Sequence, residues 1–362
     1  MASSSLSSDI LYDILRRLDG GNLARVGCVC NEFHTISIEE KLWEDVCNTL
    51  WPSTCREDVR SLISSIGGYR KFYADCFPLI INRPATAAAA ADDDTIHTDT
   101  DSESVLPSDF VSIVDVKYRD RTIYSKIVHG IPGSDGFQQG WFYNCPFRFD
   151  MLDSDTMLEG ELTLSSADGL PLVTSMERER KDGKLWRDLH GNVKLSWIIV
   201  DTKIKQAANL ASWVPMTGQR HWPTDNDFFL RFGSILPARN ILRCHAAECI
   251  LVMKFSADII TGGVGGGVRL RELSMQLEDI GGARVNGKNS LLVLKQGLSC
   301  HRSRNYGEIL KSCQMYFKAQ MEHKQEKIEQ EIQLDRFCIL CGFFMFFFFI
   351  CCFQIWISTN GS

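Results

Sequence analysis

The stretch Leu6-Ser7-Ser8-Asp9-Ile10-Leu11-Tyr12-Asp13-Ile14-Leu15-Arg16-Arg17-Leu18 decides how the N-terminal part of this chain folds. Its apolar residues recur at the spacing of an amphipathic helix, which gives one wide apolar stripe. Ser7 or Ser8 can cap the start of that helix, and Asp9 favours the positive end of its dipole. Gly20-Gly21 is expected to end the helix, and Asn22 to cap the next one.

Two further apolar stripes follow. The first consists of Leu23, Val26, Val29, Cys30 and Phe33, and the second of Ile36, Ile38, Leu42, Trp43 and Val46. The sequence therefore predicts three short helices within residues 1–50. A unit of this size seldom has a sufficient core of its own, so we expect it to need the surface of a partner.

The order of residues in these helices resembles the F-box motif. Leu6 to Leu18 resembles its opening, and Leu23 to Phe33, with the landmark Val29-Cys30, resembles its middle. Ile36-Ser37-Ile38 and Leu42-Trp43 resemble its end. Ser7 stands where the family usually has proline, and Phe33 where it usually has tryptophan. The helical run that follows, with Trp51-Pro52-Ser53, looks like that of plant F-box proteins that have no named substrate-binding repeat.

The resemblance implies a function. F-box helices pack on a Skp-family adaptor, which hangs from a cullin scaffold that carries a RING subunit. The rest of the chain would hold a protein substrate near activated ubiquitin, at high effective concentration. The chain would then be the substrate-recognition adaptor of an SCF-type ubiquitin ligase, a non-catalytic subunit. The residues expected at the adaptor interface are Leu6, Ile10, Ile14, Leu15, Leu18, Leu23, Val26, Val29 and Cys30.

Two other interpretations of these helices stay open. Their apolar residues could form the core of an autonomous helical hairpin. Even within an F-box some of the stripe must pack internally, so half of the nine could be core residues rather than contacts. The chain could also be a binding module outside the ligase, a lectin-like β sandwich with or without a membrane tether. An enzyme built on the β region is disfavoured because no nucleophile motif such as Gly-x-Ser-x-Gly is present.

The pattern changes after residue 50. Residues 51–82 are expected to form a helical extension that Gly67-Gly68 interrupts, and residues 83–108 an acidic flexible linker. Residues 109–300 are expected to form a mainly antiparallel β domain, a sandwich or a barrel, so the fold class is α+β. The predicted strands are Phe110–Val116, Thr122–Val128, Gly160–Leu164, Val193–Val200, Phe228–Phe232, Cys249–Phe255, Val268–Leu277 and Ser290–Leu294.

No cofactor or metal is expected. The glycine-rich run Thr261–Gly267 is followed by strand-like alternation, which favours a hairpin loop over a phosphate loop. Cys28 with Cys30, Cys244-His245 with Cys249, and Cys338 with Cys341 lack the paired knuckles of a zinc site. His221 and Trp222, with Asp225 and Asp227, are more typical of a loop than of a catalytic or sugar-binding patch.

Composition and charge exclude some further classes of function. The chain has 362 residues, a net charge of −6 and 14 cysteines. An acidic balance argues against nucleic-acid binding, which usually needs a basic stripe. Residues 1–8 do not resemble a secretory signal, and scattered cysteines in a long chain are typical of reduced thiols. We expect the N-terminal part to lie in the cytosol or the nucleus.

The last part of the chain differs again. Residues 306–336 are expected to form a charged helix, and residues 337–357 carry no charge and are rich in Phe, Ile and Cys. At ~1.5 Å per residue this segment can cross a bilayer core of roughly 30 Å, as a tail anchor. A buried core helix and the translation of a T-rich intron, indicated by Phe346 to Phe349, are the two alternatives.

Overall fold

The computed structural model describes residues 8–82, 105–132, 139–152, 172–173, 183–220, 227–258 and 266–360. The chain divides into two compact units, Met1–Cys313 and Gln314–Ser362. Several predicted features lie outside the described residues: Leu6, Ser7, the strand at 160–164, the linker residues 83–104, the patch at 221–225 and the glycines up to 265.

The N-terminal region contains four helices, where the sequence predicted three. They are α1 (Ser8–Leu15), α2 (Gly20–Val26), α3 (Asn31–Ser37) and α4 (Glu40–Leu50). The predicted second helix is two helices, because Cys30 has extended backbone angles and precedes α3 as its N-cap. The expected cap of α2 was also wrong: Asp19, not Asn22, accepts a 2.8 Å hydrogen bond from the backbone N–H of Asn22.

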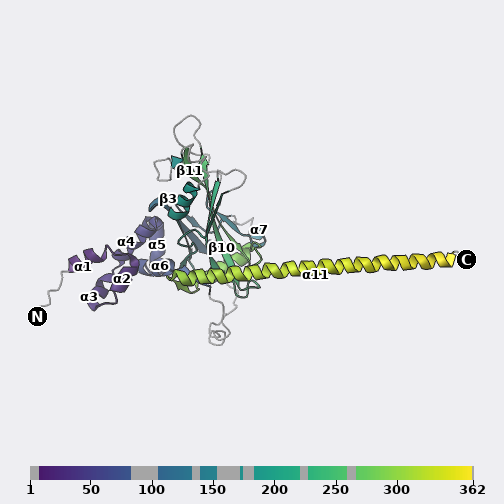
Figure 1. Cartoon of the computed structure of the whole chain (residues 1–362). Coiled ribbons are helices and arrows are strands. Elements are labelled where there is room, and N and C mark those ends of the chain that lie inside the picture. The colour runs from purple at the N-terminus through teal and green to yellow at the C-terminus, as the bar shows by residue number, and fades with distance from the viewer. Residues whose placement is uncertain are drawn as a thin grey trace. The chain divides into compact units, whose positions relative to one another are not determined.

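A second helical group follows and lies between the first group and the strands (Figure 1). It consists of the 3₁₀ helix η1 (Pro52–Cys55), α5 (Glu57–Ile66) and α6 (Tyr69–Cys76). Gly67 ends α5 in a left-handed conformation, with a φ of 114°, which explains why glycine stands there. The interruption at Gly67-Gly68 agrees with the sequence prediction.

The strands form two larger antiparallel sheets and one small pair. The first sheet has the order β3 (Arg121–His129), β2 (Phe110–Tyr118), β6 (Val193–Asp201), β7 (Gln206–Asn209). The second has the order β4 (Arg148–Asp150), β11 (Gly266–Glu278), β10 (Ala246–Asp258), β9 (Asp227–Pro237), β8 (Thr217–Arg220), and β5 (Leu172–Val173) also pairs with β11. β1 (Leu79–Ile80) pairs with β12 (Arg302–Ser303). The short helices η2 (Pro107–Asp109), α7 (Gln139–Asn144) and α9 (Lys184–Asn192) complete this region.

The first sheet packs against a hydrophobic core on each face, and its strands β2 and β6 are almost wholly buried. One face shares a hydrophobic core with the second sheet, in which the rings of Phe149 and Trp197 meet edge to face at 5.4 Å. The other face contributes Val111, Ile113, Ile198, Val200 and Ala207 to the core of the helical region. Strands buried on both faces lose the alternation of polar and apolar residues, as the pattern of β2 shows. The α+β fold with antiparallel sheets agrees with the prediction.

The predicted strand at Ser290–Leu294 is wrong, because these residues lie in helix α10 (Gly287–Leu298). Asn286 caps this helix by accepting a 2.9 Å hydrogen bond from the backbone N–H of Asn289. The buried residues Leu291, Leu294 and Leu298 recur at helical spacing and join the core between the sheets. A short apolar run cannot by itself distinguish a buried strand from a buried helix.

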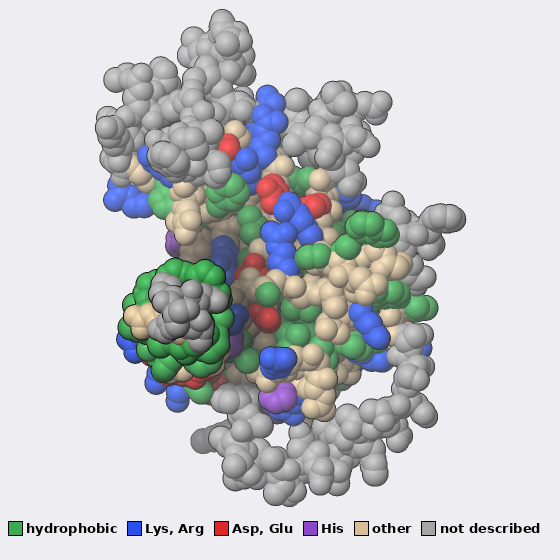
Figure 2. Space-filling model, turned by 90° about the vertical axis from the view of Figure 1, so that its right-hand side faces the viewer, with side chains coloured by type: hydrophobic (Ala, Val, Ile, Leu, Met, Phe, Trp, Pro, Cys, Tyr) green, Lys and Arg blue, Asp and Glu red, His purple; other side chains and the backbone are tan. Residues whose placement is uncertain are grey.

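The chain ends in one long helix, α11 (Tyr306–Asn360). It is the helix among the described residues that is long and apolar enough to cross a membrane, with a mean hydropathy of 2.5 in its most apolar window. None of that window is buried. Figure 2 views this helix from its C-terminal end and shows hydrophobic side chains around the helix axis.

Candidate functional site

Helix α1 presents two different apolar stripes. Leu11 and Leu15, one turn apart, are buried and pack in the core of the helical region. Ile10 and Ile14, also one turn apart, are 50% and 49% exposed. Because residues four apart lie on the same side of a helix, the two pairs form adjacent stripes, one turned into this chain and one turned to solvent. The exposed stripe is free to meet another polypeptide.

The nine predicted contact residues therefore differ in how deeply they are buried. Leu15 and Leu23 are buried in the core, and Leu18 and Val26 are partly buried against it. Ile10 and Ile14 are exposed, and Val29 and Cys30, between α2 and α3, are exposed as well, with Val29 at 68%. Leu6 lies outside the described residues. The exposed members come from two separate segments of the N-terminal region.

Buried aromatic residues hold the N-terminal helices to the second helical group. The indole N–H of Trp43 donates a 2.7 Å hydrogen bond to the carbonyl of Ser37, which fixes α4 against the end of α3. The Trp43 ring lies 5.2 Å from the ring of Tyr73 on α6. Burial of rings of this size dominates the packing of so small a unit.

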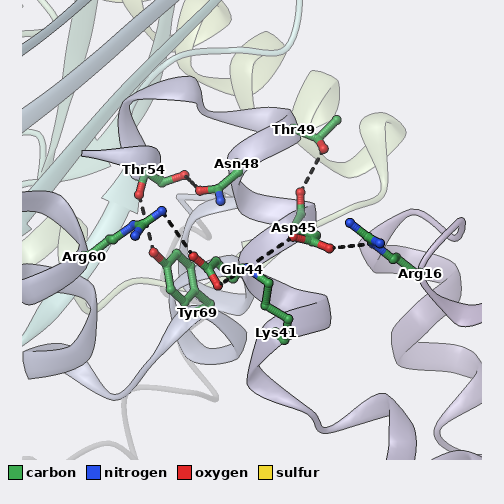
Figure 3. Close-up of polar contacts among 9 residues, drawn as sticks. All are labelled: Arg16, Lys41, Glu44, Asp45, Asn48, Thr49, Thr54, Arg60 and Tyr69. Carbon is green, nitrogen blue, oxygen red and sulfur yellow. Dashed lines mark hydrogen bonds and ion pairs between the residues drawn. The ribbon is translucent and has the colours of Figure 1, made fainter. Parts of the chain in front are cut away.

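Charged residues add a second connection among α1, α4 and α5 (Figure 3). Arg16 pairs with Asp45 at 2.8 Å, and Arg60 pairs with Glu44 at 3.5 Å. Lys41 lies 2.7 Å from Glu44 and 3.7 Å from Asp45, and the hydrogen bond that it donates to Glu44 raises the pKa of Lys41. Such exposed pairs are screened by solvent and stabilise only weakly, so they orient the helices more than they stabilise them.

No sequence pattern pointed to the junction between the helical region and the first sheet. The indole N–H of Trp51 donates a 3.1 Å hydrogen bond to the hydroxyl of Ser196 on β6. Ser53 in η1 donates two hydrogen bonds to the carboxylate of Asp115 on β2. Burial raises the pKa of Asp115, and the hydrogen bonds from Ser53 and Ser125 oppose that shift. The helical region thus contacts the sheet through buried polar groups as well as apolar ones.

The second sheet carries paired charges on the side away from its core. Arg231 and Glu248 lie 2.6 Å apart, Lys254 and Asp227 2.9 Å, and Arg148 and Glu272 3.0 Å. Glu248 is nearly fully buried, which raises its pKa, and Arg231 opposes that shift. Among the described residues, no group of three or more His, Cys, Asp or Glu could hold a metal ion.

Comparisons with known proteins agree with the N-terminal geometry. The family model described as F-box-like matches residues 8–49, which are α1 to α4. The chain is 31% identical to the F-box protein At2g27310 of Arabidopsis thaliana, over 95% of this chain and 94% of that protein. It is 30% identical to the F-box protein At3g44326 of the same plant, over 91% of this chain and 82% of that protein.

A further relative matches only part of the chain. The F-box protein SNE of Arabidopsis thaliana is 35% identical over 75 residues, which are 21% of this chain and 48% of that protein. No solved structure matches the chain. The four small helices and the full-length similarity define a protein with an F-box followed by an antiparallel β region. The chain belongs to the F-box protein family.

Proposed function

We propose that this chain is the substrate-recognition subunit of an SCF-type ubiquitin ligase. The observation that carries the proposal is the exposure of Ile10, Ile14 and Val29 in a region whose neighbouring residues Leu11 and Leu15 are buried. Full burial of an isoleucine stabilises by about 1.5–3 kcal/mol, so covering these side chains is a substantial driving force. A Skp-family adaptor is the partner that the family membership supports.

The β region is the part that would select the protein substrate. The family match stops at residue 49, while the similarity to At2g27310 covers 95% of the chain. Trp51, Ser53 and Lys71 bond to residues of the β region, so the two regions are joined by direct contacts as well as by the peptide chain. A substrate held by the sheets would have a defined position relative to the F-box. Proximity to the activated ubiquitin is then this chain's contribution, and no catalytic group is required of it.

Adaptor capture tests the F-box proposal. The variant with both Ile10→Asp and Ile14→Asp should lose capture of a purified Skp-family adaptor, because two charges would then face an apolar partner. The matched control is Val214→Asp, which changes a residue of similar exposure, 46%, in the β region. Undiminished capture by the folded double variant would contradict the proposal and favour a binding module outside the ligase.

We also propose that residues 337–357 anchor the protein in a membrane, with the F-box on the cytosolic side. The segment is apolar around its whole circumference, and Arg336 precedes it directly. The match to At2g27310 leaves 5% of this chain uncovered, and the segment after Arg336 is longer than that uncovered part. Some residues of the segment therefore lie within the match.

Fractionation tests the anchor. The full chain should remain with membranes after washing at high salt and at alkaline pH, because the interaction is apolar. A variant that ends at Arg336 should move to the supernatant. If both proteins remain in the supernatant, the anchor proposal is wrong, and the adaptor proposal is unaffected.

A further inference from the structure

The part of α11 that precedes the proposed membrane span has no packed side. Residues 324–336 are all exposed, and among their apolar members Ile328 is 50% and Ile332 45% exposed. Met321, which comes shortly before them, is 72% exposed. A helix in water gets most of its stability from packing an apolar side against a neighbour. The exposed apolar side chains of this stretch therefore indicate a partner for the helix.

These apolar residues follow the heptad spacing of a coiled coil. Met321, Gln325, Ile328 and Ile332 are separated by alternating steps of four and three residues, and we call these four residues the seam. Met321 and Ile328 take the d positions, and Gln325 and Ile332 the a positions, on one side of the helix. A polar residue at a single a position, here Gln325, fixes the register of two helices at a cost in stability. The next d position is Asp335, so the seam ends at Ile332.

Charged residues border the seam on both sides. Lys324 and Glu331 take g positions, and Glu329 and Arg336 take e positions. In two parallel helices, each g residue lies opposite the e residue of the following heptad on the other helix. Lys324 then faces Glu329 of a second copy, and Glu331 faces Arg336 of that copy. Both pairs join opposite charges, and the two-fold symmetry of such a dimer makes each pair occur twice.

The charges beside the seam are available for these pairs. In the part of the chain that the structure describes, Lys324, Glu331 and Arg336 have no ion pair. Glu329 accepts a 2.9 Å hydrogen bond from the side-chain amide of Gln325, which is neutral. Charges at e and g positions set the partner and the orientation of a coiled coil. Here they favour a second copy of the same helix in parallel orientation.

The membrane span supports the same arrangement. Two copies anchored by the same tail lie parallel, so the inference rests on the proposed anchor. Tethering to one membrane raises the effective concentration of the two helices, which a seam of this length needs. Gly342 falls on a later d position within the span, and a side chain there would meet nothing within 4 Å. Small residues let neighbouring helices approach closely in a membrane.

We infer that residues 321–336 form a parallel two-stranded coiled coil with the same residues of a second copy of this chain. The seam is its apolar contact, and the two kinds of charge pair fix its register. The dimer carries two β regions. A protein substrate with two binding segments is therefore held more tightly by the dimer than by one copy.

Capture between two differently tagged full chains in detergent tests the inference. Lys324→Glu and Glu329→Lys should each lower capture of the same variant by at least about fivefold, because opposite charges become like charges at both symmetric pairs. A mixture of the two variants should restore capture to nearly the wild-type amount, since the reversed charges then face each other across the two copies. The matched control is Glu326→Lys, an exposed residue at a b position outside the seam, which should leave capture unchanged.

Three results would overturn the inference. They are no capture between wild-type chains, equal capture in all variants, and no gain when the two variants are mixed. Equal capture would assign the association to aggregation of the tail. Restoration in the mixture also shows that both variants are folded. If the charge reversals act as expected but the chain fails to remain with membranes, the anchor proposal alone is wrong.

Discussion

The hydroxyl of Ser53 donates a 2.5 Å hydrogen bond to the carboxylate of Asp115, and the backbone N–H of Ser53 donates a second, of 3.2 Å, to the same group. Ser53 lies in η1, directly after the F-box helices, and Asp115 lies in the middle of β2. Both residues are buried. A carboxylate in such a place must be hydrogen-bonded to be tolerated, so η1 has a specific position on the sheet.

The first prediction concerns the pH dependence of this contact. Burial raises the pKa of Asp115 above 3.8, so the folded chain binds this proton more readily than the unfolded chain. The contribution of Asp115 to the free energy of unfolding should therefore increase as the pH falls from neutral toward the raised pKa of this carboxyl group. Urea unfolding of wild type and Asp115→Asn at several pH values should show wild type gaining relative to the variant in acid. A constant difference would contradict the raised pKa.

The second prediction concerns Trp51, which is 3% exposed and packs edge to face with Phe72 at 5.4 Å. Trp51→Ala should lower the free energy of unfolding by about 3–5 kcal/mol through the cavity that it leaves. Ser196→Ala removes only the hydrogen bond from the indole and should cost about 1 kcal/mol. Denaturant titration measures both. Equal losses in the two variants would mean that Trp51 does not act mainly by packing.

The third prediction separates the two stripes of α1. Leu15→Ala should lower the free energy of unfolding by about 2–5 kcal/mol, because Leu15 is a core residue. Ile14→Ala, at the neighbouring position, should change stability by less than about 1 kcal/mol and weaken adaptor binding instead. Thermal unfolding and adaptor titration of the two variants give the comparison. Reversed effects would place the contact surface on the Leu11 and Leu15 side.

The sequence predicted the helices of the F-box region and the antiparallel sheets, because their apolar periods are strong. It did not show which side of α1 faces the core, since Ile10, Leu11, Ile14 and Leu15 together span both stripes. The same ambiguity of apolar runs produced the wrong strand at Ser290–Leu294. The apolar period of a long element predicts its type. It does not give the type of a short apolar run or the side of a helix that is buried.

The contacts between the helical region and the rest of the chain could not be predicted for a different reason. Ser53 and Asp115 are 62 residues apart, and neither belongs to a motif. Arg304 and Tyr73 are likewise far apart in the sequence, yet the guanidinium group of Arg304 lies 5.7 Å from the centre of the Tyr73 ring. Local patterns carry no information about such pairings, which depend on how helices and sheets pack.

The last prediction uses the depth of residues in the proposed membrane span. Phe347 lies at the centre of residues 337–357, and Phe337 lies at the end next to Arg336. An arginine at the centre of a span costs about 2.5–3.5 kcal/mol, whereas one at the end can reach the headgroups. Phe347→Arg should therefore reduce the membrane-bound fraction in an insertion assay, and Phe337→Arg should leave it nearly unchanged. A tail that associates by unspecific aggregation would respond equally to both substitutions, since aggregation has no centre and no end.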